Sequence, residues 1–344
     1  MRGKGQFENA QTGEMNTVAE RGQITEPRGR EQVLISLVLP VYNEQATIEK
    51  CIEEAFEVLQ EYGLPFEIIA VDDGSEDQSG EILQGLRVRY RAYLRIAKHL
   101  HNKGNGAALR TGIRLSRGEV VVTMDTDGQH SPREIPNLLA KIPPYDMVVG
   151  ARPAGYRGSL YRNLANRFYN RFASWLAQYP IQDLTSGYRA MRRTSVTHFL
   201  PIYPAGFSSP TTVTLAFLKA GYSVAYVPIK VEPRTKGTSK IDIFRDGGRF
   251  LVIILRMIIL YDPLRIFLPV TLLLFILGSL SMVVGIWAAE RLVVPGSAVV
   301  LFIAAVLSFL MGLLSHQISA ASIPYYGDEF IYLYENPGDK PKDK

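Results

Sequence analysis

Residues 120–130 read VVVTMDTDGQH, an apolar run that ends in two aspartates separated by one residue. Val120–Met124 has the length and β-branched content of a buried strand. Two carboxylates one residue apart at a strand end can share a hard divalent cation, which takes oxygen ligands. We therefore expect Asp125 and Asp127, with Gln129 as a third oxygen ligand, to bind Mg²⁺ or Mn²⁺. An Asp-x-Asp pair is common on protein surfaces, so this prediction depends on the position of the pair directly behind a strand.

Short apolar runs alternate with helical stretches, which predicts an α/β fold with a mainly parallel, Rossmann-like sheet. In such a sheet, ligands bind at the carboxyl ends of the strands. Polar clusters directly follow three of the runs, at residues 42–44, 72–75 and 125–127. Thr47 is expected to cap the first helix, and Gly63 is expected to end it. The predicted strands are Ile35–Leu39, Glu67–Val71, Tyr93–Ala97, Val120–Met124, Met147–Val149 and Ser223–Val231, and the predicted helices are Thr47–Tyr62, Gln78–Tyr90, Gly106–Ser116, Pro132–Ile142, Leu160–Gln178 and Thr211–Ala220.

The clusters after the first two strands could both reach a ligand at this edge of the sheet. The sequence DDGS at residues 72–75 offers a carboxylate that can accept hydrogen bonds from a base or a ribose, while Gly74 permits a tight turn. The alternative is an Asp-rich turn that caps the next helix. Residues 40–44, PVYNE, place the carboxylate of Glu44 over the same edge, or serve only as the entry loop of a helix.

The segment NKGNGAA at residues 102–108 precedes a predicted helix, and its main-chain N–H groups could contact a phosphate. It superficially resembles the Gly-x-Gly-x-x-Gly dinucleotide fingerprint. However, Leu109 occupies the last position, and the segment follows the third strand rather than the first. We therefore reject a dehydrogenase, and the sequence contains no Walker A motif.

The charge and cysteine content of the chain narrow its partners and its compartment. The 344 residues carry a formal net charge of +5, which fits an anionic partner such as a phosphate ligand or a lipid surface. Nucleic acid is not an expected partner, because no dense Lys/Arg stripe is interleaved with aromatic residues. The single cysteine, Cys51, excludes an intramolecular disulfide and indicates a reducing compartment. Cys51 falls on a predicted helix, where packing explains it better than nucleophilic catalysis.

Five regions are expected along the chain. Residues 1–32 form a polar, disordered tail, residues 33–240 an α/β catalytic domain, residues 241–262 an amphipathic helix in the membrane interface, residues 263–316 a two-helix transmembrane hairpin, and residues 317–344 a C-terminal tail. The two spans are predicted at Ile266–Ala289 and Leu292–Leu314. Each is long enough to cross a bilayer, which needs about 20 residues.

The charges that flank these spans predict an integral membrane protein with a defined orientation. Arg245, Arg249, Arg256 and Arg265 precede the first span, so its N-terminal end should face the cytoplasm. The catalytic domain and both termini would then be cytoplasmic. The alternative is a buried helical hairpin in a soluble protein.

Taken in chain order, the motifs between Ser36 and Lys240 resemble glycosyltransferase family two, whose members have the GT-A fold. The resemblance rests on PVYNE, DDGS and NKGNGAA, together with DTDGQ at residues 125–129. The later half is similar to the polyprenyl-phosphate branch of that family, which includes dolichol-phosphate mannose synthases and bacterial undecaprenyl-phosphate sugar transferases. That similarity is carried by Arg152, by Arg162 and Asn166 one helical turn apart, and by SGYR at 186–189 and RTKGTSK at 234–240.

This resemblance implies that a nucleotide-sugar, GDP-mannose or UDP-glucose, gives one hexosyl residue to undecaprenyl or dolichyl phosphate, with inversion and with a divalent metal. The residues that it implies for the nucleotide-sugar are Pro40, Tyr42, Glu44, Asp72, Asp73, Lys103, Gly104, Asp125 and Thr126. The residues that it implies for the acceptor phosphate are Arg152, Arg162, Asn166, Ser186, Arg234 and Lys240. Asp125 and Asp127, together with Arg152, Arg162 and Arg234, would carry the reaction.

The chemistry of a lipid phosphate acceptor is consistent with this residue set. A polyprenyl monophosphate, with a second pKa of about 6, is mostly dianionic at neutral pH and needs no general base to become a nucleophile. The protein would mainly supply cations that bring two anionic substrates together. Asp183 stands where related sugar-hydroxyl transferases place a base, and here we favour a structural or acceptor-orienting role for it.

Two other functions compete with this one. A processive membrane polysaccharide synthase would carry a Gln-x-x-Arg-Trp signature, whereas neither Trp175 nor Trp287 is preceded by arginine. A non-catalytic nucleotide-sugar-binding membrane protein would have no need of the intact Asp-x-Asp and arginine set. The sequence leaves the sugar, the polyprenol and homo-oligomerisation open.

Overall fold

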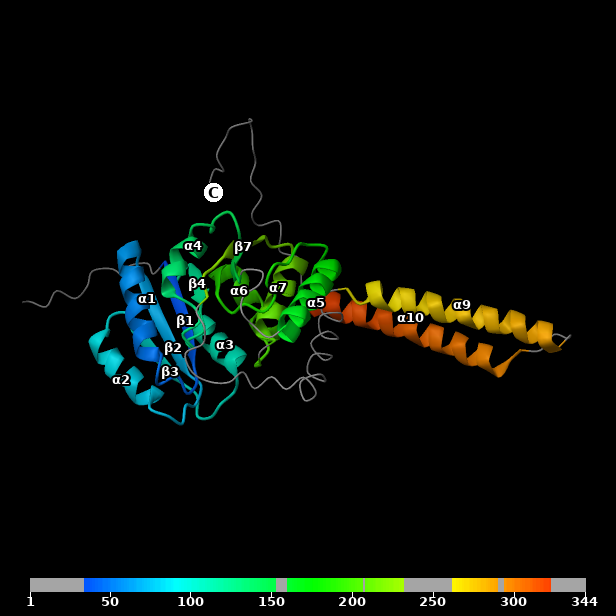
Figure 1. Ribbon diagram of the computed structural model, residues 1–344, viewed down its shortest axis with the longest axis horizontal. Helices are drawn as coiled ribbons and strands as arrows, with labels where there is room; N and C mark the ends of the chain where they lie inside the picture. The colour runs from blue at the N-terminus through cyan, green and yellow to red at the C-terminus, as the bar shows by residue number, and fades with distance from the viewer. Residues whose placement is uncertain (1–33, 153–159, 207, 232–261, 290–293, 323–344) are drawn as a thin grey trace, which may run out of the picture. The chain divides into compact units, whose positions relative to one another are not determined.

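The computed structural model describes residues 34–152, 160–206, 208–231, 262–289 and 294–322. The predicted tail at 1–32 and the predicted interface helix at 241–262 lie outside these residues, except for Asp262. In the described part, seven strands form one sheet in the order β3-β2-β1-β4-β6-β5-β7 (Figure 1). The strands are β1 (Ile35–Val41), β2 (Phe66–Asp72), β3 (Leu94–Lys98), β4 (Val120–Thr123), β5 (Met147–Ala151), β6 (Arg189–Arg192) and β7 (Val224–Pro228).

The sheet is parallel except for β6, which pairs antiparallel with both β4 and β5. The mainly parallel sheet predicted from the alternating pattern is therefore confirmed. The strand β6 was not predicted, because its four residues include two arginines and show no apolar run. Since β6 runs against its neighbours, it begins at the edge of the sheet where β4 and β5 end.

Helices cover both faces of the sheet, as continuous apolar strands require. The helices are α1 (Ile48–Tyr62), α2 (Ser79–Arg89), α3 (Asn105–Leu115), α4 (Ile135–Leu139), α5 (Leu160–Ala177), α6 (Arg193–His198) and α7 (Ser209–Lys219), with 3₁₀ turns η1 (Pro132–Glu134) and η2 (Leu200–Ile202). In β1, Leu37 and Leu39 pack with α1, α2 and α4, whereas Val38 packs with α3, α6 and α7. The alternation of β1 therefore serves two hydrophobic cores, one on each face.

Helix ends follow the sequence in part. Gly63 ends α1 in the left-handed conformation with φ of 79°, as predicted. Thr47 occupies the N-cap position of α1 but makes no side-chain capping bond. The predicted helix Pro132–Ile142 is divided into η1 and the five-residue α4.

Two long apolar helices, α9 (Leu264–Ala289) and α10 (Gly296–Ser322), form an antiparallel hairpin. Gly278 approaches Phe302 and Gly312 approaches Phe267, so the two helices pack along their length. Both are long and apolar enough to cross a membrane, and their large apolar side chains are mostly exposed rather than buried in a protein core. The second helix starts four residues later than the predicted span at Leu292 and continues beyond residue 316, to Ser322.

Burial explains the predicted packing role of Cys51. The side chain lies in the core between α1 and the sheet, and burial raises the pKa of the thiol to about 12. At pH 8, only about 10⁻⁴ of such a thiol would be ionised. We expect iodoacetamide to leave Cys51 unlabelled in the folded protein at pH 8 and to label it after denaturation. Mass spectrometry measures this, and fast labelling of the folded chain would contradict the packing role.

Candidate active site

The predicted site residues converge because parallel strands all end at the same edge of the sheet. β1, β2, β4 and β5 end there and lead to Tyr42, Asp72–Asp73, Asp125 and Arg152, respectively. The antiparallel β6 begins at this edge, so the segment before Arg189 also lies there. Predicted site residues stand at all five positions, Ser186 in the segment before β6 among them, although β6 itself was not predicted as a strand.

Thr126 fixes the loop that carries the two aspartates. Its hydroxyl donates to the carbonyl of Pro40, with an oxygen–oxygen distance of 2.8 Å, and its carbonyl accepts from the hydroxyl of Thr47 at 2.7 Å. The side chain is 3% exposed. Thr126 therefore ties the end of β4 to the end of β1 and the start of α1. Pro40, likewise buried, takes part through its carbonyl.

Asp125 and Asp127 project from this loop with different neighbours. One carboxylate oxygen of Asp125 accepts from Nδ2 of Asn105 at 3.3 Å, and the other lies 3.9 Å from Nδ1 of His130. Oδ1 of Asp127 accepts from the main-chain N–H of Gln129 at 3.1 Å. Asn105 belongs to the NKGNGAA segment, but nothing in the sequence pattern indicates that its side chain reaches Asp125.

These residues fit a divalent cation that is shared with a phosphate ligand. Nowhere among the described residues do three His, Cys, Asp or Glu side chains gather closely enough to hold a metal ion. Mg²⁺ in such sites is typically held by one or two carboxylates together with substrate phosphates and waters. Asp125 and Asp127 could supply two oxygen ligands of this kind, and Gln129 stays a predicted third ligand.

Gly187 brings the SGYR segment against Asp125. A Cβ atom at this position would lie 2.7 Å from Oδ2 of Asp125, so only a residue without a side chain leaves the carboxylate in place. The preceding residue, Ser186, is buried, and its hydroxyl accepts from the N–H of Tyr188 at 3.3 Å. Ser186 therefore holds this turn, and its predicted contact with an acceptor phosphate stays a prediction.

Asp73 organises the loop that precedes α3. Its carboxylate accepts from the main-chain N–H groups of Lys103 at 3.0 Å and Gly104 at 2.8 Å. His99, which follows β3, places Nδ1 2.6 Å from Asp73 and Nε2 2.9 Å from the hydroxyl of Thr111. Asp73 and His99 are buried, so these bonds make Asp73 a fixed anchor for the loop. Sequence reasoning did not find His99.

Gly104 is required in this loop for two reasons. Its φ of +97° is strained for any residue with a side chain, and a Cβ would lie 2.6 Å from the carbonyl oxygen of Ala205. Asp72 closes the neighbouring turn by accepting from the N–H of Ser75 at 2.8 Å, and its other oxygen lies 3.5 Å from Nζ of Lys98. The exposed side chain of Lys103 and these turns line the same edge.

The loop after β1 contributes Tyr42 and Glu44. The ring of Tyr42 is 40% exposed at the edge, which leaves a flat face for a ligand base. Glu44 accepts from the hydroxyl of Thr47 at 3.0 Å, and its N–H donates to Ser79. Both residues lie beside the Asp-x-Asp loop because Thr47 bonds to Glu44 and Thr126 at once.

Arg152 forms a bidentate ion pair with Asp183. Nε lies 2.7 Å from Oδ2 and Nη2 lies 2.9 Å from Oδ1, while Nη2 also donates to the hydroxyl of Thr185 at 2.5 Å. Burial raises the pKa of Asp183, but the hydrogen bonds and charge of Arg152 outweigh it, so this pKa lies below its ordinary value. Asp183 thus orients the arginine that was predicted to bind the acceptor phosphate. This geometry fits the structural or orienting role favoured for Asp183.

Arg189 is a second arginine at this edge, and it is completely enclosed. Nε donates to the carbonyl of Ser186 at 2.8 Å, and Nη2 donates to the carbonyl of Leu184 at 3.3 Å. Burial lowers the pKa of this guanidinium, and Asp183 and Asp125 are among the charges that oppose the shift. Arg189 therefore holds the turn between Asp183 and Gly187 through these two carbonyl groups.

The remaining predicted residues fall where the structure gives no side-chain description. Arg162 and Asn166 lie on the described backbone of α5, while Arg234 and Lys240 lie outside the described residues. Val231, the last described residue before them, forms a β-bridge with His130. The chain therefore leaves the described domain beside the Asp-x-Asp loop.

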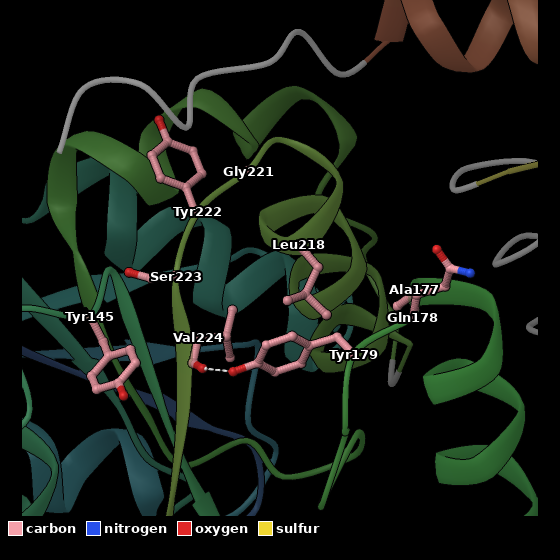
Figure 2. Close-up of a pocket in the computed structure, with 9 residues that line it drawn as sticks. All are labelled: Tyr145, Ala177, Gln178, Tyr179, Leu218, Gly221, Tyr222, Ser223 and Val224. Carbon is pink, nitrogen blue, oxygen red and sulfur yellow. Dashed lines mark hydrogen bonds between the residues drawn. The ribbon is translucent and has the colours of Figure 1, made fainter. Parts of the chain in front are cut away.

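A separate pocket of about 380 Å³ opens at the other end of the sheet (Figure 2). It includes Ser223 and Val224 at the start of β7, and the hydroxyl of Tyr179 donates to the carbonyl of Val224 at 2.5 Å. It contains none of the predicted site residues. The predicted site residues therefore lie at the carboxyl edge of the sheet and not in this pocket.

The fold and this edge define the class of GT-A proteins. The structure is similar to glucosyl-3-phosphoglycerate synthase from Mycobacterium tuberculosis, solved with Mn²⁺, UDP and phosphoglyceric acid, with a TM-score of 0.51 and 20% identity over 66% of this chain and 78% of that one. Residues 36–200 match the family model Glycosyl transferase family 2, and residues 262–321 match the GtrB C-terminal hairpin.

Curated relatives extend this match across most of the chain. An undecaprenyl-phosphate 4-deoxy-4-formamido-L-arabinose transferase from Pectobacterium carotovorum subsp. carotovorum (strain PC1) is 30% identical over 306 residues, which cover 83% of this chain and 88% of the relative. A transferase of the same name from Pseudomonas aeruginosa (strain LESB58) is 34% identical over 187 residues, which span 52% of this chain and about half, 55%, of the relative. The chain therefore belongs to glycosyl transferase family 2.

The contact between Gly187 and Asp125 can be tested by adding one methyl group. The backbone of Gly187 is not left-handed, so Gly187→Ala should fold, but its Cβ would displace the carboxylate of Asp125. We expect Mn²⁺ affinity, measured by paramagnetic resonance titration, to fall about tenfold, as for other changes next to a metal ligand. Gly85→Ala, where a Cβ meets nothing within 4 Å, is the matched control. Unchanged Mn²⁺ affinity in Gly187→Ala would contradict the prediction that Asp125 is a metal ligand.

The Arg152–Asp183 pair predicts a pH-dependent stability. Asp183→Asn should lower the free energy of unfolding at pH 7 by about 2 kcal/mol, because a largely buried guanidinium loses its charged partner. Because the pKa of Asp183 is lowered in the folded state, the native pair stabilises above the unfolded pKa and stops stabilising as pH falls through the folded pKa. The difference between the two proteins in urea unfolding should therefore shrink in acid. Glu53→Gln removes the exposed pair with Arg89 and should change stability by less than about 1 kcal/mol. Equal effects from both variants would contradict this account.

Proposed function

We propose that this chain transfers one sugar residue from a nucleotide-sugar to undecaprenyl phosphate at a membrane surface. The observation that carries the proposal is the relative from Pectobacterium carotovorum, whose similarity runs through both the catalytic domain and the apolar hairpin. The hairpin has its own family match, and its two helices are long enough to span a bilayer. A lipid acceptor explains why one chain combines the two parts.

The described residues divide between the two substrates. The loop held by Thr126 presents Asp125 and Asp127 toward the donor pyrophosphate, and the loop anchored by Asp73 presents main-chain N–H groups beside it. A divalent cation bound by the two aspartates would neutralise charge on the departing nucleoside diphosphate. Arg152, which follows β5 at the same edge of the sheet, would bind the acceptor phosphate.

The reaction needs no general base from the protein. An oxygen of the dianionic lipid phosphate attacks the anomeric carbon, and the bond from that carbon to the nucleoside diphosphate breaks, with its electron pair going to the leaving oxygen. Inversion follows from a single displacement of this kind. Asp183, paired with Arg152, keeps the guanidinium aimed at the edge until a phosphate competes for it. Arg162, Arg234 and Lys240 stay predicted partners of the same phosphate.

The donor remains a choice among sugars. GDP-mannose and UDP-glucose follow from the resemblance of the motifs, and the names of the curated relatives add 4-deoxy-4-formamido-L-arabinose. We also propose that the catalytic domain faces the cytoplasm, because Arg265 in the first turn of α9 and the arginines that precede α9 in the sequence should lie on that side by the positive-inside rule. Both termini would then face the cytoplasm with it.

A transfer assay with the full chain in proteoliposomes tests this function. Undecaprenyl phosphate is incubated with each radiolabelled nucleotide-sugar, and label in the lipid fraction is counted. We expect one donor to label the lipid, and we expect Asp127→Ala or EDTA to abolish transfer while the fold is retained. Glu61→Gln, an exposed carboxylate at the far end of α1, should remain active. Transfer that survives both Asp127→Ala and EDTA would exclude the metal site, and label found only in sugar or polysaccharide would exclude the lipid acceptor.

A further inference from the structure

An aromatic stripe runs along the outer face of α5. Phe168 is 58% exposed, Trp175 is 50% exposed, and Phe172 between them is half-buried. The ring centroids of Phe168 and Phe172 lie 6.2 Å apart, and those of Phe172 and Trp175 lie 5.9 Å apart. The adjoining side of α5, with Tyr169 and Leu176, packs into the domain, and Phe172 packs partly against that core. Phe168 and Trp175 therefore form an exposed aromatic surface, joined by the half-buried ring of Phe172.

Two arginines accompany this stripe. Arg167 and Arg171 are both exposed and lie one helical turn apart beside the aromatic rings. This surface of α5 thus combines exposed aromatic rings with cationic side chains. It is typical of a helix at the level of lipid headgroups, where rings enter the interface and arginines bind phosphates.

The end of α5 is joined to the start of the first candidate span. Nη1 of Arg265, in the first turn of α9, donates to the carbonyls of Trp175 at 2.6 Å and Leu176 at 2.9 Å. The guanidinium also lies 5.4 Å from the centre of the Trp175 ring. A cation on these carbonyls satisfies the C-terminal end of α5. The residue that begins the span therefore touches the aromatic stripe directly.

The second helix of the hairpin meets the domain at the same level. Nζ of Lys219, the last residue of α7, donates to the hydroxyl of Ser319, near the end of α10. Because the hairpin is antiparallel, the end of α10 lies beside the start of α9. Two independent contacts thus place the domain ends of both candidate spans against α5 and α7.

We infer that the face of α5 formed by Phe168, Phe172, Trp175, Arg167 and Arg171 is a docking surface for an anionic lipid bilayer. Arg265, in the first turn of α9, contacts Trp175. Because α9 enters the membrane from this turn, Trp175 must lie at the level of the lipid headgroups. The stripe extends along the helix axis for roughly 10 Å, so all three rings meet lipid only if this part of α5 lies nearly parallel to the bilayer. The arginines then face the anionic headgroups.

This orientation has a consequence for the acceptor, which rests on the proposed function. Arg162 is thirteen residues before Trp175, roughly 20 Å along the same helix. A helix that lies along the surface keeps both ends near the depth of lipid phosphates. The predicted acceptor residues at the start of α5 would then receive a lipid phosphate without drawing its apolar chain out of the bilayer.

Tryptophan fluorescence can test the docking surface, because the chain has only Trp175 and Trp287. In Trp287→Phe, Trp175 alone reports on α5. The full chain is reconstituted in phosphatidylcholine and phosphatidylglycerol vesicles that contain phosphatidylcholine brominated near the headgroup or deep in the acyl chain. We expect blue-shifted emission, loss of intensity that is greater with the shallow bromines, and weak quenching by aqueous acrylamide. Trp175→Phe leaves Trp287 on the exposed surface of α9 and verifies that the hairpin is inserted, since bromolipid should quench it.

Two other outcomes would overturn the inference, and neither depends on catalytic activity. Strong quenching by acrylamide without quenching by bromolipid would place Trp175 in water. Protection from both quenchers would mean that protein covers the stripe, either a second copy or another segment of this chain.

A charge-matched pair of variants in the Trp287→Phe background tests the arginines. Arg167→Gln with Arg171→Gln should lose part of the bromolipid quenching in vesicles with phosphatidylglycerol. Arg87→Gln with Arg91→Gln, exposed residues on and just after α2 at the opposite edge of the sheet, should leave it unchanged. If both pairs behave alike, the arginines of α5 do not contact lipid headgroups.

Discussion

The parallel pairing of β1 with β2 and β4 is the constraint on which the site depends. Register fixes Val38 opposite Thr123 and Val41 opposite Asp72, so the loops after three strands emerge side by side. A slip of one residue would exchange the faces of Leu37 and Val38, which belong to different cores, and would carry the aspartates away from their partners. Hydrophobic burial on both faces therefore determines where the polar chemistry lies.

The polar groups at that edge are held by the protein before any ligand arrives. Asp73 is committed to the loop before α3, Thr126 to β1 and α1, and Asp183 to Arg152. Each such contact restricts a backbone or a side chain, so the entropy of ordering is met during folding rather than during binding. Asp125 and Asp183 are among the charges that act on the buried guanidinium of Arg189 at this edge. The carboxyl edge of the sheet is therefore organised for charged ligands.

Much of this fold follows from the sequence, and the exceptions have physical causes. The apolar runs located six strands, and the polar residues behind them located Asp125, Asp73 and Tyr42. The strand β6 was not predicted because its pairing is determined by the neighbouring strands and not by a residue pattern of its own. Spacing along the chain could not show that Gly187 abuts Asp125 or that Arg152 pairs with Asp183, because these partners are more than thirty residues apart and meet only in the fold.

Side-chain direction was the second limit of the sequence. Asp73 and Thr126 stay predicted contacts of a nucleotide-sugar, and the sequence did not show that their side chains also bond to Gly104 and Pro40. A buried polar group must find a partner, and a nearby main-chain group is the most accessible one. Residue type and position at a strand end therefore predicted which residues lie together at this edge of the sheet, but not the contact that each side chain makes.

Arg265 joins the catalytic domain to the hairpin through contacts that are likewise made during folding. One guanidinium satisfies two carbonyls at the end of α5 and lies against Trp175, while its own backbone begins α9. A long linker would let a domain sample many heights above a membrane, and each would have to be excluded again when substrate binds. A direct contact at the first turn of the span removes that freedom. The helix that enters the membrane thus determines the depth of α5 relative to the bilayer. The position of α5 in turn determines the height of the carboxyl edge of the sheet above the membrane.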